Sequence, residues 1–585
     1  MTTPKYLLAA LALLTTNAIT SLAEPAASTA SADRTQWFRE ARFGLFIHWG
    51  VYAVPAGEWQ GKQIGGIGEW IMKNGKIPVA DYKAFAKDFT ASKYDPAAWA
   101  SLARRAGMKY VVITSKHHDG FALYDTGASD WNAVQASGAG RDLLVPLAQA
   151  VRAEGLKFGL YYSQAQDWTN PGGAKAGNTP DWDSLQTGDY DHYLRTVALP
   201  QVREIIERFD PAIIWWDTPT NMTRERVKPF ADFMAEHPAI LNNNRLGTGF
   251  AGDTKTPEQH IPPRGYPGEL FEVCMTMNDT WGFKKNDTNW KSVRQLLRNL
   301  SDISSKGGNF LLNVGPTADG EIPAASIERL EAVGRWMNIN SEAIYATEAG
   351  PFPRRLPWGR VTQKRTSAAG ATSLYLHVWE WPADGRILLP TVAQSPRSAR
   401  LLAIDSAVTT ETTPDGLIVR LPASAPDPDV SVVRLDFPGF VTVTQEPFLT
   451  PGPDGRANFG AADADAHGHW DGNIQLRDSG PDAYLTDWKN PKWRLEYTIK
   501  TPAAGEWTVT AEVATPFATS LVLGVGKTDI PVSIEPTGPG LTWNTIKLGV
   551  IELPAGEASF ELRGAPAGWK GLSVRHLSLT PASTP

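Results

Sequence analysis

The chain has 585 residues, of which 42% are hydrophobic and 20% are charged, and its formal net charge is −6. This length suggests two to four domains, and the composition is that of a globular protein and not of a disordered one. The mild charge argues against nucleic acid as a partner, because neutralising phosphates requires a basic surface. A single cysteine excludes an intramolecular disulfide and a cysteine-based zinc site. Tryptophan is abundant, with 22 residues against 21 Phe and 15 Tyr, which favours a ligand that stacks on flat rings.

The first 23 residues have the pattern of a secretory signal peptide. Lys5 precedes the apolar run Leu7–Leu14, and the small-x-small sequence Ser21-Leu22-Ala23 comes next. The apolar run is well short of the roughly 20 residues that span a bilayer, so a membrane anchor is the weaker interpretation. We therefore expect an exported protein, periplasmic or secreted and of bacterial type, with no membrane insertion after the signal is removed.

Between residues 34 and 350, short apolar runs alternate with segments of helical periodicity. Continuous apolar strands separated by helices predict a parallel sheet that is buried on both faces. Seven such runs favour a (β/α)8-like barrel of the TIM type, complete or irregular, over an open sheet. The runs are Phe43–Ile47, Tyr110–Ile113, Phe158–Tyr162, Ala212–Trp216, Ala239–Leu241, Phe271–Met275 and Phe310–Val314.

Three helices are expected between these runs. One begins near Asp142 and carries Pro146 in its first turn, where proline is tolerated. A second crosses residues 194–206 with a break or kink at Pro200. A third has apolar residues at helical spacing from Trp290 onward, and Gly307-Gly308 ends it.

After about residue 350 the pattern becomes that of antiparallel strands. Pro351, Pro353 and Pro357 break any continuing helix, and the runs beyond them have no helical period. We expect a β-sandwich domain over 351–440 and a β-rich C-terminal domain over 441–585, joined by a linker near 445–460. The expected strands are Thr372–Trp379, Arg386–Leu389, Val430–Phe437, Arg494–Thr498, Glu506–Val513, Ser520–Val525 and Ser559–Leu562.

Six tryptophans in the C-terminal domain raise the hypothesis that it binds carbohydrate. They are Trp470, Trp488, Trp493, Trp507, Trp543 and Trp569. Filling the core of a sandwich is the alternative, and it is favoured for Trp493 and Trp507 because both lie in strand patterns.

Polar residues and tryptophans come directly after five of the predicted barrel strands. In α/β barrels the functional groups lie at the C-terminal ends of the strands, so these side chains should converge on one rim. The segments are His48-Trp49-Gly50, Lys116-His117-His118-Asp119-Gly120, Tyr161-Tyr162-Ser163, Trp215-Trp216-Asp217 and Asn243-Asn244-Arg245. Hydrogen-bonding groups beside ring faces are what a sugar-binding site requires.

Three carboxylates are candidates for catalysis. Asp217 ends a buried strand among aromatic rings, although Asp-Thr-Pro is also good turn chemistry and spacing does not separate the two interpretations. A glycosidase needs a second carboxyl group, and Glu258 and Glu272 are available. The alternatives are a solvated loop charge for Glu258 and an inward hydrogen-bonding or ion-pairing residue for Glu272.

The adjacent histidines His117 and His118 are a poor metal signal. Neighbouring residues on a strand point to opposite faces, and no HExxH spacing accompanies them. A structural role stays open for one of the pair and for His48.

Several motifs, in order and spacing, resemble those of the α-L-fucosidases of glycoside hydrolase family 29. They are Phe43-Gly44-Leu45-Phe46-Ile47-His48-Trp49-Gly50, Gly68-Glu69-Trp70, Lys116-His117-His118-Asp119-Gly120-Phe121, Gly159-Leu160-Tyr161-Tyr162-Ser163, Trp215-Trp216-Asp217 and Thr256-Pro257-Glu258-Gln259. The resemblance covers residues 34–350. It implies a retaining exo-glycosidase that removes terminal α-linked L-fucose from oligosaccharides or glycoconjugates, with no metal and no other cofactor.

The resemblance also implies roles for individual residues. Asp217 corresponds to the nucleophile that forms a glycosyl-enzyme ester, and Glu258 to the acid/base, with Glu272 as second choice. The residues that resemble fucose-binding positions are His48, Glu69, Trp70, His117, His118, Tyr161, Trp215 and Arg245. Two other functions compete: a metal-dependent barrel hydrolase and a carbohydrate-binding protein with a degenerate site.

Overall fold

The computed structural model describes residues 33–582, except 263, 354–355, 357, 367–369, 445–447, 468–473 and 478–482. The predicted signal peptide, residues 1–23, lies outside the described residues, as do Trp470 and part of the expected linker.

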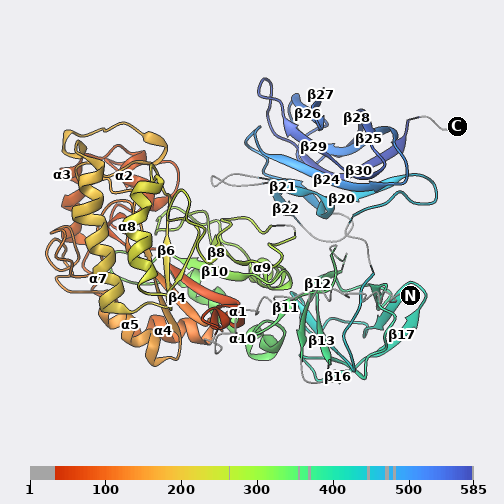
Figure 1. The fold of residues 1–585 in the computed structure, drawn as a ribbon, viewed down its shortest axis with the longest axis horizontal. Helices are drawn as coiled ribbons and strands as arrows, with labels where there is room; N and C mark the ends of the chain where they lie inside the picture. Colours follow the sequence, from red (N-terminus) through yellow and green to blue (C-terminus); the bar gives the residue numbers. More distant parts are fainter. Residues whose placement is uncertain are drawn as a thin grey trace, which may run out of the picture.

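Eight parallel strands form a nearly closed barrel in which order in space matches order in the chain (Figure 1). They are β1 (Phe43–Ile47), β4 (Tyr110–Lys116), β5 (Lys157–Tyr162), β6 (Ile213–Trp216), β7 (Leu241–Asn242), β8 (Thr254–Lys255), β9 (Leu270–Thr276) and β10 (Asn309–Val314). Strand β1 pairs with both β4 and β10. Between β7 and β8 the backbone N–H of Asn244 donates to the Thr254 carbonyl at 3.0 Å. The predicted barrel is confirmed, with β8 added to the seven expected strands.

Helices cover the outside of the barrel (Figure 1). The longer helices are α4 (Pro96–Arg105), α5 (Leu144–Ala153), α7 (Leu199–Phe209), α8 (Arg224–Ala235), α9 (Val293–Ser305) and α10 (Ala324–Asn340). The shorter helices are α1 (Gln36–Ala41), α2 (Ile71–Asn74), α3 (Val79–Ala84) and α6 (Tyr190–Tyr193). Two short strands, β2 (Glu58–Trp59) and β3 (Lys62–Gln63), pair with each other. The expected break near Pro200 is a π-helical turn, Leu194–Ala198, just before α7. Within the described residues no helix combines the length and apolarity of a membrane span.

Alternation along the strands separates the barrel interior from the layer under the helices. In β1, Phe46 packs inside the barrel, whereas Leu45 and Ile47 belong to the core beneath the helices. Successive side chains of a strand point to opposite faces, so a strand buried on both sides is apolar throughout. This explains why the barrel strands are continuous apolar runs in the sequence.

The segment after the barrel forms two antiparallel sheets around one core. The six-stranded sheet contains β11 (Glu348–Ala349), β12 (Gly359–Arg365), β13 (Thr372–Val378), β19 (Ser431–Phe437), β15 (Ser398–Leu401) and β16 (Ser406–Ala407), and the three-stranded sheet contains β14 (Arg386–Pro390), β18 (Gly416–Arg420) and β17 (Thr409–Thr413). Leu376 and Leu435 from the first sheet share their core with Leu389 and Leu417 from the second. The three strands predicted in this segment are confirmed.

The C-terminal residues form a second pair of antiparallel sheets, drawn in blue in Figure 1. One sheet contains β22 (Gln475–Arg477), β23 (Tyr484–Thr486), β30 (Ser573–Pro581), β25 (Gly505–Ala514), β28 (Asn544–Leu553) and β20 (Ala457–Gly460); the other contains β21 (Asp465–His467), β24 (Arg494–Thr501), β29 (Gly556–Gly564), β26 (Thr519–Val525) and β27 (Thr528–Ile534). Trp493 and Trp507 are buried in the core between them, as predicted. Trp488 is also buried there and Trp569 packs against it, so Trp543 is the one described tryptophan of the six outside this core.

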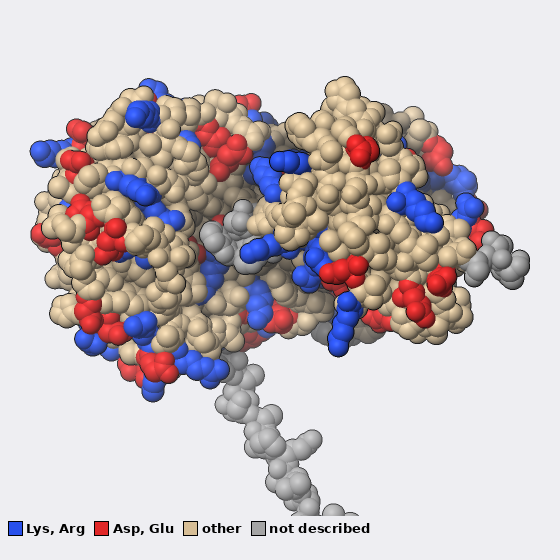
Figure 2. Space-filling view, turned by 90° about the horizontal axis from the view of Figure 1, so that it is seen from above, with Lys and Arg blue, Asp and Glu red and all other residues tan. Residues whose placement is uncertain are grey.

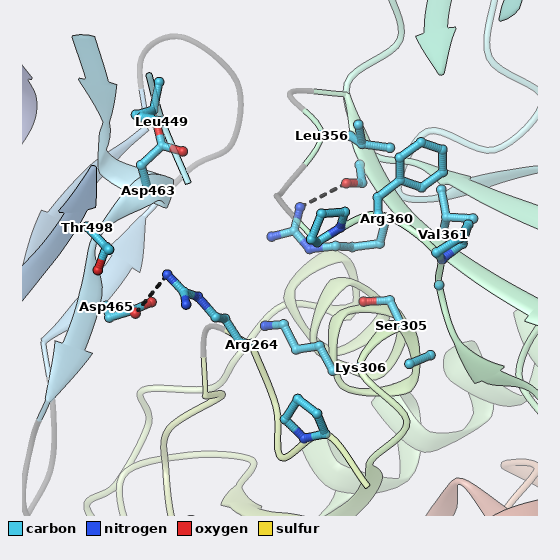
Figure 3. A pocket seen from close by; sticks show the side chains of 17 residues that line it. Arg264, Ser305, Lys306, Leu356, Arg360, Val361, Leu449, Asp463, Asp465 and Thr498 are labelled. Carbon is cyan, nitrogen blue, oxygen red and sulfur yellow. Dashed lines mark hydrogen bonds and ion pairs between the residues drawn. The ribbon is translucent and has the colours of Figure 1, made fainter. Parts of the chain in front are cut away.

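A cavity of about 460 Å³ lies where the barrel, the sandwich and the C-terminal sheets meet (Figure 3). Arg264, from the loop between β8 and β9, lies 3.7 Å from the carboxylate of Asp465 in β21. Lys306 and Arg360 both pair with Asp302. Figure 2 shows Lys and Arg side chains gathered along the hollow between the two halves of the molecule. Because Lys306 precedes β10, this cavity lies near the N-terminal ends of the barrel strands, away from the predicted catalytic residues.

Candidate active site

The C-terminal ends of β6, β7 and β8 bring three charged side chains together. Asp217 comes directly after β6, and Arg245 and Glu258 lie just beyond β7 and β8. Glu258 forms a parallel bridge with Cys274 of β9, and the N–H of Gln259 donates to the Cys274 carbonyl at 2.9 Å. The sequence predicts an irregular loop for Glu258, but in the structure this residue is hydrogen-bonded alongside strand β9 of the barrel.

Arg245 links the two carboxylates. Its Nη1 donates to Asp217 Oδ1 and to Glu258 Oε2, each at 2.8 Å, so these two oxygens are no farther apart than twice that distance. Its Nε donates to Thr256 Oγ1 at 2.8 Å, and its Nη2 to the Thr256 carbonyl at 2.9 Å. The planar guanidinium is therefore held in one orientation by four hydrogen bonds.

Asp217 is placed to remain ionised. Tyr161 donates its hydroxyl to Oδ2 at 2.9 Å, and the Asp217 backbone N–H donates to Gln164 at 3.1 Å. Burial by itself raises the pKa of this carboxyl, but the charge of Arg245, the nearby His118 and the hydrogen bonds from Arg245 and Tyr161 together outweigh it, and the pKa lies below its ordinary value. A carboxylate charged at neutral pH is what a nucleophile requires.

Glu258 shows the opposite shift. Burial raises the pKa of its carboxyl, the attraction of Arg245 opposes that effect, and the negative charge of Asp217 raises it further, for a net increase. Two carboxyl groups whose pKa values are pushed apart mark a nucleophile and an acid in one site. Burial and charge therefore shift the pKa of Asp217 toward the ionised carboxylate and that of Glu258 toward the protonated carboxyl.

Two histidines beside Asp217 are neutral. His48 Nδ1 donates to Asn313 Oδ1 at 2.7 Å, and His118 Nδ1 donates to Ser163 Oγ at 2.7 Å. Burial lowers the pKa of His48 to about 3 and that of His118 to about 4. At neutral pH the 3.5 Å approach of His118 Nε2 to Asp217 is thus a polar contact, not an ion pair.

Buried polar atoms without protein partners lie in the same region. Glu69 Oε2 accepts the N–H of Gly282 at 2.8 Å, but within the described chain Oε1 has no partner, and neither has His117 Nδ1. Burial raises the pKa of Glu69 to about 7 and lowers that of His117. An unsatisfied buried polar group costs about 1–3 kcal/mol, so these atoms are ready to bond ligand hydroxyls.

The predicted aromatic contacts differ in exposure. The Trp70 ring is half-buried and lies 5.5 Å from those of His118 and Trp168. Trp215 is 2% exposed, and its ring stacks with that of Tyr161 at 5.8 Å and 20°. Sugar contact by either ring stays a prediction, and the Nζ of Lys73 lies 4.7 Å from the centroid of the Trp70 ring.

Glu272 lies inside the barrel. It is fully buried, and it pairs with Asn309 at the N-terminal end of β10. Trp215 Nε1 donates to Oε1 at 2.8 Å and the Tyr110 hydroxyl donates to Oε2. These contacts fit the inward hydrogen-bonding interpretation, and it is Glu258 that shares Arg245 with Asp217.

Sequence reasoning missed three residues of the site. The Trp281 ring lies 5.0 Å from that of His48, and Asn313 orients His48 from β10. Gln164, directly after the Tyr161-Tyr162-Ser163 segment, holds the Asp217 backbone. Trp281 and Asn313 lie on or just beyond the last two barrel strands, β9 and β10, whose C-terminal ends also reach the polar rim. Across the described residues no group of three or more His, Cys, Asp or Glu side chains could hold a metal ion.

Comparison with known proteins places this geometry in a family. A model of the family described as "Alpha-L-fucosidase" matches residues 10–342. Tissue α-L-fucosidase of Homo sapiens is 31% identical over 432 residues, covering 70% of this chain and 88% of the relative. An α-L-fucosidase of Branchiostoma floridae is 33% identical over 386 residues, covering 62% of this chain and 82% of the relative.

Solved structures agree. The α-L-fucosidase of Vibrio sp. strain EJY3 is 26% identical, covers 94% of this chain and 98% of its own, and superposes with a TM-score of 0.70. Isoenzyme 1 from Paenibacillus thiaminolyticus is 37% identical with a TM-score of 0.62, covering 69% of this chain and 99% of its own. The fold, the family model and the relatives together show that this chain belongs to the α-L-fucosidases of glycoside hydrolase family 29.

Proposed function

We propose that the protein is a retaining exo-α-L-fucosidase that hydrolyses terminal α-L-fucose from oligosaccharides or glycoconjugates. The Asp217–Arg245–Glu258 bridge carries this proposal. Retaining glycosidases hold their carboxyl groups about 5–5.5 Å apart, and inverting ones about 6.5–9.5 Å. Both carboxylate oxygens lie 2.8 Å from one nitrogen, which fits the retaining arrangement.

A solved relative supports a covalent mechanism. An α-L-fucosidase of Bacteroides thetaiotaomicron, 28% identical, was trapped as a covalent intermediate with 2-fluoro-fucosyl fluoride using a glutamate-to-glutamine mutant. Its structure covers 69% of this chain and 95% of its own, with a TM-score of 0.61.

In the first step, Asp217 attacks the anomeric carbon and forms an ester while the glycosidic bond breaks. Glu258 gives its proton to the departing oxygen, so the aglycone leaves as an alcohol. In the second step, Glu258 takes a proton from water, the resulting hydroxide attacks the anomeric carbon, and fucose is released with Asp217 restored.

The electrostatic coupling supplies the switch between these roles. In the free enzyme the negative charge of Asp217 raises the pKa of Glu258. Ester formation removes that charge while Arg245 stays, so the pKa of Glu258 falls. The acid of the first step thus becomes the base of the second.

Neutral rings and a buried carboxyl would hold the sugar. His48 and His118 donate Nδ1–H to Asn313 and Ser163, so the Nε2 of each neutral ring is left to accept a hydrogen bond from a hydroxyl. His117 Nδ1, which has no partner within the described residues, is available to a further hydroxyl. Glu69 offers its unpartnered Oε1, and Trp70 offers ring surface to the apolar face of fucose.

Labelling and rescue test the assignment. We expect 2-fluoro-fucosyl fluoride to label the peptide that contains Asp217. Glu258→Ala should lose most activity on poor leaving groups, and azide should partly restore its turnover of an activated aryl fucoside. Labelling elsewhere, or azide rescue of Glu272→Ala but not of Glu258→Ala, would overturn the assignment. Fucose binding without turnover would favour a carbohydrate-binding protein with a degenerate site. Inactivation by a chelator would favour a metal-dependent hydrolase.

We also propose that the C-terminal domain binds carbohydrate through Trp543. This half-buried ring lies outside the core, 5.7 Å from the ring of Tyr484, and Arg575 stacks on it at 4.9 Å. Arg575 is held by Glu512, to which its Nε donates at 2.8 Å. Rings beside charged hydrogen-bonding groups suit saccharides.

Trp543→Ala should weaken retention on a fucosylated polysaccharide in affinity electrophoresis, and Phe440→Ala, which removes an exposed ring elsewhere, should not. Equal retention of both variants would remove the case.

We propose that the protein is exported to the periplasm or beyond after removal of residues 1–23. The basic, apolar and small-x-small segments of the N-terminus support this. N-terminal sequencing of protein expressed in a bacterium, together with cell fractionation, tests it. Cytoplasmic protein with an intact N-terminus would refute it.

A further inference from the structure

We propose that Glu272 is a positioning residue that acts through Trp215 to hold the two groups that organise Asp217. The inference rests on the proposed function, because it assigns a task within that active site. It gives Glu272 a role other than acid/base catalysis, and gives Trp215 a role other than sugar contact alone.

The first link joins Glu272 to Trp215. Glu272 has no exposure, and each of its oxygens accepts a hydrogen bond, Oε1 from the Trp215 indole at 2.8 Å and Oε2 from the Tyr110 hydroxyl. Burial raises its pKa to about 7, so the carboxyl is partly uncharged near neutrality. The two hydrogen bonds from Trp215 and Tyr110 oppose that rise, because both are donated to the carboxyl oxygens.

The second link joins Trp215 to the groups that hold Asp217. Trp215 lies on β6, and its neighbours come from the flanking strands β5 and β7. Tyr161, its register partner on β5, stacks with it at 5.8 Å and donates its hydroxyl to Asp217. Arg245, beyond β7, places its guanidinium carbon 4.7 Å from the indole centroid. One ring therefore contacts both side chains that hydrogen-bond the Asp217 carboxylate.

The hydrogen bond to Glu272 fixes the rotation of that ring. An indole can turn about two side-chain torsions, and Nε1 lies on its edge, so an acceptor there selects one orientation. Without an acceptor, the buried N–H is left unsatisfied and the ring has reason to turn. A turned indole would displace Tyr161 and Arg245, and both displacements would weaken the hold on Asp217.

Three substitutions separate this role from others. Glu272→Leu removes the acceptor, Glu272→Gln keeps an amide oxygen for Trp215 Nε1, and Trp215→Phe keeps a ring but removes the N–H. We expect Glu272→Leu and Trp215→Phe to lower kcat/KM on an activated aryl fucoside about 10- to 100-fold, as a lost buried acceptor suggests. Glu272→Gln should retain at least about a third of wild-type kcat/KM, and azide should rescue none of them.

The pH profile distinguishes positioning from loss of stability. Arg245 and Tyr161 lower the pKa of Asp217, so displacing them should move the acid limb of kcat/KM to higher pH. Trp216→Phe is the matched control. It removes another buried indole N–H, which donates to Asn242 at 2.9 Å, from a ring that packs against Phe230 of helix α8. We expect this control to lower the melting temperature without moving the acid limb.

A double-mutant cycle completes the test. If Glu272 acts through Trp215, adding Glu272→Leu to Trp215→Phe should cost less than about a further twofold in kcat/KM. Additive losses, an unmoved acid limb in Trp215→Phe, or azide rescue of Glu272→Leu would each overturn the inference. If Glu272→Leu does not fold, the Trp215→Phe profile alone decides the matter. Failure of the proposed function is seen separately, as a wild-type enzyme that does not hydrolyse the fucoside.

Discussion

Replacing Arg245 by Met should disable the site by removing the cation between two carboxylates. The side chains of Arg245, Asp217 and Glu258 are 17%, 13% and 21% exposed, so solvent screens them little. Breaking a pair of this kind by removing one partner costs about 3–5 kcal/mol. That is a cost in stability. Removal of a preorganised donor from an active site lowers kcat by about 10²- to 10³-fold, and we expect a fall of that size in kcat/KM.

The same variant should change how activity and stability depend on pH. Without Arg245 the pKa of Asp217 rises, so the acid limb of the kcat/KM profile moves to higher pH. In the wild type, the lowered pKa of Asp217 stabilises the fold at every pH above 3.8, the ordinary pKa of an aspartate. This contribution is lost as the pH falls through the lower pKa that Asp217 has in the folded protein. The melting temperature of Arg245→Met should therefore lie furthest below wild type near pH 7 and approach it only below pH 3.8, where the wild type loses this contribution.

The measurements are hydrolysis of an aryl fucoside and thermal unfolding, each followed from about pH 2.5 to 8 so that the acid limb of the wild type is included. Arg226→Met is the control, because Arg226 also pairs with an aspartate, Asp191, and stacks on Tyr190 at 4.8 Å, but this pair is more exposed, at 28% and 47%. Its kcat/KM should stay within about twofold of wild type, since exposed pairs contribute little. A loss under tenfold in Arg245→Met, or an unshifted acid limb, would refute the reasoning.

Three further outcomes are expected. Tyr161→Phe removes the hydroxyl that donates to Asp217 but keeps the ring that stacks on Trp215. We expect kcat/KM to fall about 10- to 150-fold and the acid limb of its pH profile to move to higher pH. A fall of less than threefold would contradict this. Lys116→Met breaks the fully buried pair with Asp167 and should lower the free energy of unfolding, measured with a chemical denaturant, by about 3–5 kcal/mol. Lys228→Met, at an exposed helical pair, should lower it by under about 0.5 kcal/mol. Equal losses would show that burial is not the cause. Dialysis against EDTA should leave the rate of fucoside hydrolysis unchanged. A loss of activity that only an added divalent ion restores would refute the metal-free mechanism.

Strand prediction succeeded where a strand is long and buried on both faces. The run Phe43–Ile47 matches β1 residue for residue, because interior and helix-facing positions are both apolar. The expected strand Ala239–Leu241 is shifted, since β7 is Leu241–Asn242 and is too short to show a pattern. Strand β8, Thr254–Lys255, was missed for the same reason, although it closes the barrel and leads to Glu258.

Catalytic assignment needed more than spacing. Asp217 could be predicted as the nucleophile because a buried apolar strand precedes it and because the motif resemblance favours that role over a turn residue. Spacing alone left Glu258 and Glu272 as rivals, since each is a lone glutamate among apolar residues. Their difference lies in contacts with residues distant in the chain: Glu258 meets Arg245, and Glu272 meets Tyr110 and Trp215.

The sequence alone predicted the barrel, the β-rich segments beyond it and the set of polar residues on the rim. It could do so because burial on two faces and the end of a strand both leave a local pattern in the chain. Two properties emerged from the three-dimensional fold: Arg245 bridges Asp217 and Glu258, and the pKa values of the two carboxyls move in opposite directions. These properties depend on burial and on distances between separate strands, and neither is encoded in local periodicity.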